Sequence, residues 1–300
     1  MTQMLVFIVD ALVHATPLIM AGLAVAIAFR AGIWNIGADG QLIAGATAAA
    51  WVGVAASAQI GWLALPLAML AGIFAGGIWA AIAAWLRSRF GVLEVISTIM
   101  LNFIATYGVS YLVRGPLQEP TRVYPQTDSI AAGAQMPILV AGTRLHWGFI
   151  IALVLAVAAW WVMKFSAAGF RIRASGVNPF AARSAGLIDV PRVTTNAFIV
   201  SGAIAGIAGA IEVSGVTFAL YENISPGYGY TAIAVALLAG LNPLGVIGTG
   251  ILFGALETAA GTMQRNVGIP ATTASVIEAV IILVVIAIAQ LRERRTASAA

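Results

Sequence analysis

The amino-acid sequence predicts an all-α polytopic membrane protein with about nine transmembrane helices, and three observations lead to this fold class. Hydrophobic residues make up 61% of the 300 residues and charged residues only 9%, whereas about 25% of the residues of a soluble globular chain are charged. The mean hydropathy is +0.99. The 32 glycines suit helices in lipid, where small residues let two backbones approach closely. These features exclude a water-soluble globular protein.

Nine apolar segments each come close to the roughly 20 residues that an α-helix needs to cross a bilayer. They are residues 5–29, 40–58, 62–86, 93–113, 147–165, 194–213, 228–241, 245–263 and 271–291. The connection at 114–146 holds four prolines and is too polar to span, so we expect a loop there. The basic connection at 166–193 is a second long loop. We expect one transmembrane domain over residues 1–300.

Positively charged residues gather at the ends of these segments, as the positive-inside rule requires. Nine crossings place Arg30, Arg87, Arg89, the basic residues from Lys164 to Arg192 and the C-terminal arginines on one side, which is then cytoplasmic. The basic residues on the other side are Arg114, Arg122, Arg144 and Arg265, which leaves 11 of the 15 inside. This count predicts an extracytoplasmic N-terminus and a cytoplasmic C-terminus.

The two halves of the chain share a weak repeat, seen when residues 18–104 are laid beside 198–288. Each copy has a glycine-rich polar break (NIGADGQ, then SPGYGYT), a span rich in small residues (GIFAGGIWAAI, then GILFGALETAAG), and a carboxylate close to Val-Ile (Glu94, then Glu278). Five crossings separate the copies, so the second is inverted in the bilayer. The sequence therefore predicts an inverted repeat of four helices, with repeat A at about 5–113 and repeat B at about 194–291.

The first polar break, residues 32–45, interrupts the apolar sequence with Asn35, Asp39 and Gln41. Its glycines free the backbone to leave the helical conformation, and broken helices of this kind line transport paths. The three side chains either contact a solute or serve the protein itself. In the second case Asp39 caps the helix that begins near Gln41, and the two amides satisfy the freed backbone. Asn102 lies in mid-span, where an amide either joins helices or contacts solute.

The second break, at residues 221–231, carries a different set of polar groups. Tyr221, Glu222, Asn223, Tyr228 and Tyr230 surround a proline and two glycines. Aromatic rings beside amide and carboxylate groups suit a nucleoside, whose base stacks while its ribose forms hydrogen bonds. The alternative is a belt of tyrosines at the membrane surface. The candidate substrate path therefore comprises Asn35, Asp39, Gln41, Asn102, Glu222, Asn223, Tyr228 and Tyr230, with the two breaks as paired gates.

Several kinds of chemistry find no support in the sequence. The single lysine, Lys164, lies outside any phosphate-binding loop, and no serine stands in a G-x-S-x-G motif. With no cysteine and two histidines, His14 and His146, we expect no metal site and no cofactor on this chain. The basic residues follow membrane topology and are not interleaved with exposed aromatics, so nucleic acid is not an expected partner. The chain is not expected to be an enzyme.

A short segment of the basic loop has the signals of a capped helix at 179–185. Asn178 is a good N-cap, Pro179 suits the first helical position and Gly186 fits a C-terminal cap. Such a helix on the cytoplasmic face is what a membrane subunit needs in order to be moved by a soluble motor. It offers Phe180 and Leu187 to a partner's groove and Arg183 to its carboxylates. The alternative is a basic loop that only obeys the positive-inside rule.

Four motifs, in order along nearly the whole chain, carry a family resemblance. They are GIWNIGADGQLIAGA at 32–46, ASGVNPFAARSAGL at 174–187, SGAIAGIAGAIEVSG at 201–215 and GYTAIAVALLAGLNPLG at 229–245. The sequence resembles the permease subunits of ATP-binding-cassette (ABC) importers for simple sugars and nucleosides. It is most similar to the nucleoside permeases associated with basic-membrane-lipoprotein receptors. It departs from that pattern in having Asp39 where Glu is usual, in lacking the extra first helix, and at 114–146.

The resemblance implies a permease in the bacterial inner membrane that forms half of a path for a nucleoside or related ribose-containing solute. It also implies partners: a cytoplasmic ATPase that holds ATP and Mg²⁺, a second and paralogous permease, and an extracytoplasmic solute-binding lipoprotein. A simple sugar or a vitamin-like solute is the alternative cargo. From the residues alone, an ion-coupled secondary transporter or a passive channel also stays open.

Overall fold

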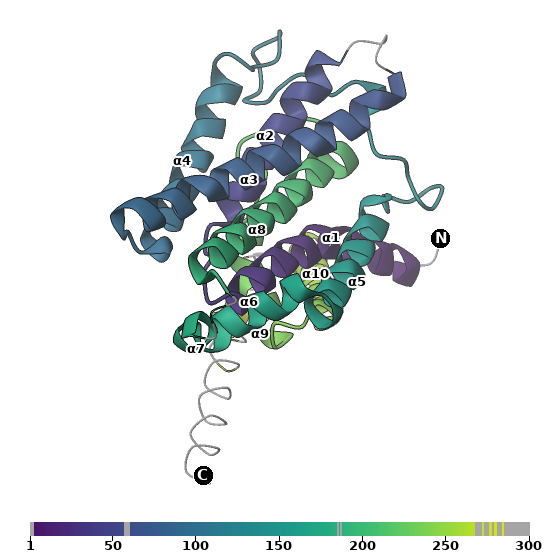
Figure 1. Cartoon of the computed structure of the whole chain (residues 1–300). Coiled ribbons are helices and arrows are strands. Elements are labelled where there is room, and N and C mark those ends of the chain that lie inside the picture. The colour runs from purple at the N-terminus through teal and green to yellow at the C-terminus, as the bar shows by residue number, and fades with distance from the viewer. Residues whose placement is uncertain are drawn as a thin grey trace.

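The computed structural model describes residues 3–56, 61–184, 186 and 188–267, together with the single positions 272, 276, 277, 279, 280 and 284. Within these residues every named element is helical and no strand is present (Figure 1). The α-helices are α1 (Gln3–Arg30), α2 (Ala38–Ala55), α3 (Ala64–Phe90), α4 (Glu94–Arg114), α5 (Gly148–Phe165), α6 (Ala167–Val177), α7 (Pro179–Ser184), α8 (Val190–Glu212), α9 (Tyr228–Leu238) and α10 (Pro243–Val267). Three shorter helical turns are η1 (Gly61–Leu63), η2 (Ala132–Ala134) and the π-helical η3 (Val213–Thr217).

The all-α membrane fold is confirmed. Six described helices are long and apolar enough to cross a membrane, namely α1, α3, α4, α5, α8 and α10. Helices α2 and α9 occupy two further predicted segments, so eight of the nine expected segments coincide with a helix. The ninth, 271–291, lies outside the described residues apart from isolated positions. The loop at 166–193 was expected to hold one short helix but holds two, α6 and α7.

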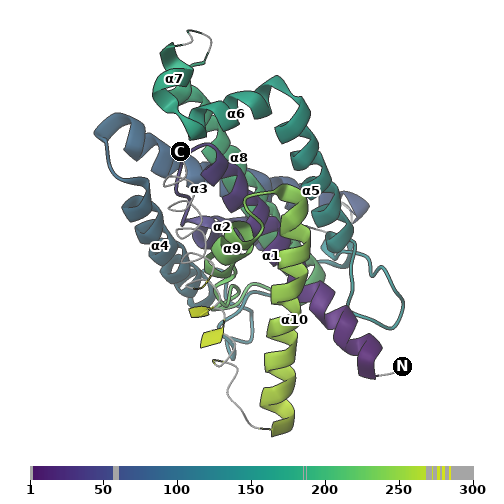
Figure 2. The same cartoon turned by 90° about the horizontal axis from the view of Figure 1, so that it is seen from below.

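Helices α1 and α8 lie at the centre of the bundle, and the others surround them (Figures 1 and 2). In α1, 83% of the apolar stretch is buried, whereas in the peripheral α5 the share is 22%. A helix that is apolar on all sides is typical of such a central position, because it meets other helices all round. The core around α1 is made chiefly of alanine, leucine and isoleucine.

Glycines allow a close helix contact between α3 and α8. A Cβ atom added at Gly76 would lie 2.3 Å from the carbonyl oxygen of Gly202, and one at Gly206 would lie 2.1 Å from the carbonyl oxygen of Gly72. Helix α2 approaches α8 in the same way, since a Cβ at Gly209 would lie 1.9 Å from the carbonyl oxygen of Leu42. The backbones therefore touch directly, as small-residue motifs in lipid allow.

The helix pairs in one half of the bundle have counterparts in the other. Helix α10 packs on α1 as α3 packs on α8, and its Gly254 meets the backbone of Ala15. Helix α9 likewise packs on α1 as α2 packs on α8. The same two helix pairs thus form on α1 and on α8, which is what an inverted repeat predicts. The bounds of the repeats stay a prediction, and Glu278, the carboxylate proposed for the second copy, lies outside the described residues.

The loop at 114–146 is irregular, as expected, and covers one end of the bundle. Its backbone bonds to the chain after α8, with Thr127 N donating to Leu220 O at 2.8 Å and Met136 N to Ser214 O at 2.7 Å. His146, at the end of the loop, is buried, and its Nδ1 accepts from Gly148 N at 3.2 Å. Burial, and secondarily the positive charge of Arg144, lowers the pKa of the His146 imidazole to about 4. A neutral ring can therefore anchor this loop.

We predict that Gly76→Ala destabilises the purified protein by about 1 to 3 kcal/mol, the usual cost of overpacking, because the new methyl group collides with the α8 backbone. Gly108→Ala in α4 is the matched control, since a Cβ there meets nothing within 4 Å. That change should be neutral or stabilise by up to about 1 kcal/mol through helix propensity. Thermal unfolding in detergent measures both. Equal midpoints for the two variants would contradict the close α3–α8 contact.

Candidate functional site

Two helices begin inside the bundle, with their N-termini against one another. Helix α2 starts after Gly37 and α9 after Gly227, which has a φ of +103° that favours glycine. A Cβ at Gly229 would lie 2.1 Å from the backbone nitrogen of Asp39. The 11 residues of α9 cover only about 16 Å at 1.5 Å per residue. Helix α9 is therefore a half-span, and it meets α2 in the interior.

The Asp39 side chain joins these two helix ends. Its Oδ1 accepts hydrogen bonds from Ser225 Oγ at 2.6 Å and from Gly229 N at 3.0 Å, and Ser225 Oγ in turn accepts from Tyr228 N at 3.1 Å. A carboxylate beside helix N-termini is stabilised by their free N–H groups and dipoles. The expectation that Asp39 caps its own helix is wrong, because the residue at the N-cap of α2 is Gly37 and no side chain caps it. Asp39 caps α9 instead.

Asn35 and Gln41 form a closed amide pair inside the first break. Asn35 Nδ2 donates to Gln41 Oε1 at 2.9 Å and to Ser201 Oγ at 2.8 Å. Asn35 Oδ1 accepts from Gly37 N at 2.9 Å and from Gln41 Nε2 at 3.1 Å. All four hydrogen-bonding positions of the Asn35 amide are thus used. This geometry favours the alternative in which the two amides satisfy the break rather than contact solute.

Asn102 connects α4 to both breaks. Its Oδ1 accepts from Gly40 N at 2.9 Å, and its Nδ2 donates to Ile36 O at 2.9 Å and to the Tyr230 hydroxyl at 3.1 Å. Asn102 is buried, whereas Tyr230 is 42% exposed. The mid-span amide therefore joins helices, and Tyr230 belongs to the same polar network.

Glu222 lies in the second break and is held by α4. Arg114 Nε donates to Glu222 Oε1 at 2.6 Å and Arg114 Nη2 to Oε2 at 2.8 Å, while Ser110 Oγ donates to Oε1. The hydrogen bonds from Arg114 and Ser110 lower the pKa of Glu222 to about 2. The carboxylate is therefore ionised at neutral pH and ties the segment before α9 to the end of α4.

Asn223 and Tyr228 line a polar cavity of about 260 Å³ beside the second break. The polar residues that complete its wall are Asp10, His14, Arg144, Glu212 and Tyr221. The sequence analysis did not include these five in the substrate path. Glu212 was the available signal for this cavity. It is a solitary carboxylate near the end of a largely apolar helix, and such a group in a membrane span is costly unless it has a role.

The two breaks are therefore one junction. The sequence analysis placed them as paired gates, but hydrogen bonds join Asp39 in the first break to Ser225 and Gly229 at the second. Each of the two helices runs away from this junction toward its own end of the bundle. Arg30 marks the end reached by α9, because its Nε donates to Leu241 O at 3.1 Å. The assignment of the eight polar residues to a substrate path stays a prediction.

The short capped helix is confirmed as α7. Asn178 Oδ1 accepts from Phe180 N at 3.1 Å and from Ala181 N at 3.0 Å, and Gly186 has a φ of +72°. Phe180 is 80% exposed, and Arg183 is exposed as well. Leu187 lies outside the described residues. The predicted caps thus form, and they present an aromatic ring and a guanidinium on the surface.

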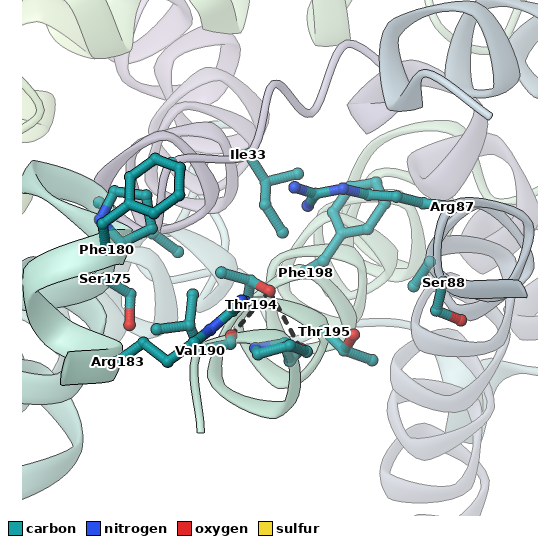
Figure 3. Close-up of a pocket in the computed structure, with 16 residues that line it drawn as sticks. Ile33, Arg87, Ser88, Ser175, Phe180, Arg183, Val190, Thr194, Thr195 and Phe198 are labelled. Atoms are coloured by element: carbon teal, nitrogen blue, oxygen red, sulfur yellow. Dashed lines mark hydrogen bonds between the residues drawn. The ribbon is translucent and has the colours of Figure 1, made fainter. Parts of the chain in front are cut away.

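A cavity of about 590 Å³ lies between α7, the start of α8 and the end of α3. Figure 3 shows Ser175, Phe180 and Arg183 on one side of it and Arg87 and Ser88 on the other. Gly32 and Ile33 of the first break also line this cavity. The surface around α7 therefore reaches the chain that leads to Asp39. No group of three or more histidine, aspartate and glutamate side chains that could hold a metal ion occurs among the described residues.

We predict that Asp39→Asn lowers the unfolding free energy by about 1 to 2 kcal/mol, because a neutral acceptor keeps the hydrogen bonds but loses the attraction to the helix dipoles. Asp39→Ala should cost more, since the Ser225 and Gly229 donors then lose their acceptor. Asp189→Asn is the control: Asp189 Oδ1 accepts from Arg192 N at the exposed N-cap of α8, where Asn caps as well as Asp. Thermal unfolding in detergent compares them, and an unchanged Asp39→Asn midpoint would rule out the charge as the cause.

Residues 7–286 match the family described as "Branched-chain amino acid transport system / permease component". The guanosine ABC transporter permease NupP of Bacillus subtilis is 41% identical, over 90% of this chain and 78% of that protein. The glucose ABC transporter permease TsgB13 of Haloferax volcanii is 38% identical, over 92% and 75%. A second guanosine permease of B. subtilis, NupQ, is 27% identical, over 84% and 81%. This chain belongs to that family of transport-system permeases.

Proposed function

We propose that this chain is the permease subunit of an ABC importer in the bacterial inner membrane, and that it forms half of the path for a nucleoside. The observation that carries the proposal is the capped helix α7, which presents Phe180 and Arg183 beside a cavity lined by the first break. A soluble ATPase that grips α7 would act on the chain that leads to Asp39. The permease contributes no chemistry, and ATP with Mg²⁺ would be held by the ATPase.

The nucleoside is preferred because NupP, a guanosine permease by name, has the higher identity. The tyrosines of the second break agree with this choice, since base stacking needs aromatic faces. A hexose is the alternative cargo of the same class, because TsgB13 is named a glucose permease at 38% identity. A vitamin-like solute has no comparable support.

The relatives and the distribution of basic residues also support a proposal for the other subunits of the importer. Two different guanosine permeases of one organism resemble this chain, which supports a pair made of this permease and a paralogue. The basic residues near α7 support a cytoplasmic position for that end and an extracytoplasmic position for the loop at 114–146. The N-terminus would then be extracytoplasmic and the C-terminus cytoplasmic, with a solute-binding lipoprotein docking on the loop side.

The proposal is tested by reconstituting the chain with its partner permease, ATPase and receptor in proteoliposomes. We expect uptake of radiolabelled guanosine that requires ATP on the ATPase side and exceeds the uptake of glucose. Uptake of glucose alone would favour the hexose alternative. Gradient-driven uptake by this chain without the ATPase would instead identify a secondary transporter, and passive equilibration would identify a channel.

We predict that Arg183→Glu or Phe180→Ser lowers co-purification of the ATPase by about tenfold or more, the effect of losing an interface hot spot. Arg122→Glu, in the loop at the other end of the bundle, is the matched control and should leave co-purification unchanged. Size-exclusion profiles of the permease alone show whether each variant is folded. Full retention of the ATPase by both α7 variants would argue that this helix is not the docking site.

A further inference from the structure

Glu212 is a buried carboxyl group that lacks a donor. It ends helix α8 with 5% exposure and faces the cavity of about 260 Å³. Among the described residues no side chain or backbone N–H donates to its carboxyl oxygens, and no basic group lies within 4 Å of them. Because these oxygens are not fully enclosed, they border the cavity and can accept hydrogen bonds from a group that enters it.

The cavity is open on the side of the long loop. Its floor is buried, since Glu212 and Tyr228 are each 5% exposed, while Arg144, Tyr221 and Asn223 at its rim are exposed. A solute arriving from that side would meet the rim first and Glu212 last. This end of the bundle lies opposite α7, so the cavity is distinct from the one shown in Figure 3.

The wall offers acceptors, donors and rings together. Asp10 and Glu212 bring carboxyl groups, Arg144 and the Asn223 amide bring N–H donors, and Tyr221 brings an aromatic face. Two adjacent hydroxyls fit this set, because each can donate to a carboxyl oxygen and accept from an N–H group. Because carboxyl acceptors and N–H donors lie on the same wall, the cavity suits a neutral polyol.

The volume decides how much of a solute fits. Pockets for drug-sized ligands measure about 300 to 1,000 Å³, and this cavity, at about 260 Å³, is smaller. The cavity has room for a sugar ring at its buried floor, and Tyr221 at the exposed rim offers an aromatic face to a base.

We propose that this cavity binds the pentose of the transported nucleoside, with the Glu212 carboxyl group accepting hydrogen bonds from its 2′- and 3′-hydroxyls. The assignment rests on the proposed function. It gives the permease its own recognition of the solute on the receptor side, separate from the Asp39 junction. Asp10 and His14 complete the wall, and Thr258 Oγ1 fixes His14 through a contact of 3.0 Å to Nδ1.

The test uses the purified permease pair with its ATPase and without the receptor, so that the receptor's own selectivity is absent. We expect guanosine to bind about tenfold or more tightly than 2′,3′-dideoxyguanosine, because each missing hydroxyl removes a hydrogen bond and leaves a buried polar group unpaired. Glu212→Gln should weaken that preference several-fold, because the amide keeps only one acceptor oxygen, while binding of the dideoxy compound stays almost unchanged. Glu94→Gln, a carboxylate at the opposite end of the bundle, should keep the preference.

Asn223→Gly provides a second variant at an exposed position, where glycine tolerates the φ of +57° as well as asparagine does, and should lower guanosine affinity without affecting the dideoxy compound. An unchanged preference in both Glu212→Gln and Asn223→Gly would overturn the assignment. Uptake by the complete wild-type importer is measured in parallel. If the complete importer takes up guanosine but the receptor-free complex binds guanosine and the dideoxy compound equally, the pentose site is overturned and the proposed function stands. If the complete importer does not take up guanosine, the proposed function is overturned.

Discussion

The interaction on which the rest of the structure depends is the carboxylate of Asp39 between two helix N-termini. Helices α2 and α9 begin at the same place in the interior and run apart, so their free N–H groups and positive dipole ends face one another. Without a negatively charged group between them, the positive ends of the two helices would repel each other. A buried carboxylate costs about 2.5 to 3.5 kcal/mol on membrane insertion scales, which hydrogen bonds from Ser225 and Gly229 offset. The buried carboxylate and the two facing helix N-termini, each unfavourable alone, thus stabilise one another.

Close glycine packing determines which helices move with this junction. Helices α2, α3 and α8 touch through their backbones at Gly45, Gly76 and Gly206, so no flexible side chain lies between them to absorb a displacement. Helix α9 belongs to the other set and packs chiefly on α1. Hydrogen bonds of the Asp39 side chain therefore cross the boundary between the two sets. A second link runs through Ser201 on α8, which accepts from Asn35 and donates to Ala24 O of α1 at 2.6 Å.

Sequence reasoning worked where the determinants are local. Hydropathy located eight of the nine expected segments in helices, and Asn178, Pro179 and Gly186 fixed α7 because capping depends on neighbouring residues. It failed where distant segments meet. Asp39 and Ser225 are 186 positions apart, and nothing near Asp39 shows that its carboxylate caps α9. Alignment of the two breaks, which places Asp39 opposite Gly229, was the available clue. Helix α6 was missed because its basic, weakly apolar sequence is typical of a loop.

Helix α8 connects all the functional regions of the permease. It begins at Val190, which packs with Ala182 of α7, passes Ser201 beside the first break, and ends at Glu212 in the polar cavity. Its 23 residues span about 34 Å as a straight helix. Because α3 holds it by backbone contacts at Gly202 and Gly206, α8 is supported as a rigid rod rather than as a bendable linker. A displacement at α7 must therefore reach Glu212 as a movement of the whole helix, which couples the α7 end of the bundle to the cavity at the other end.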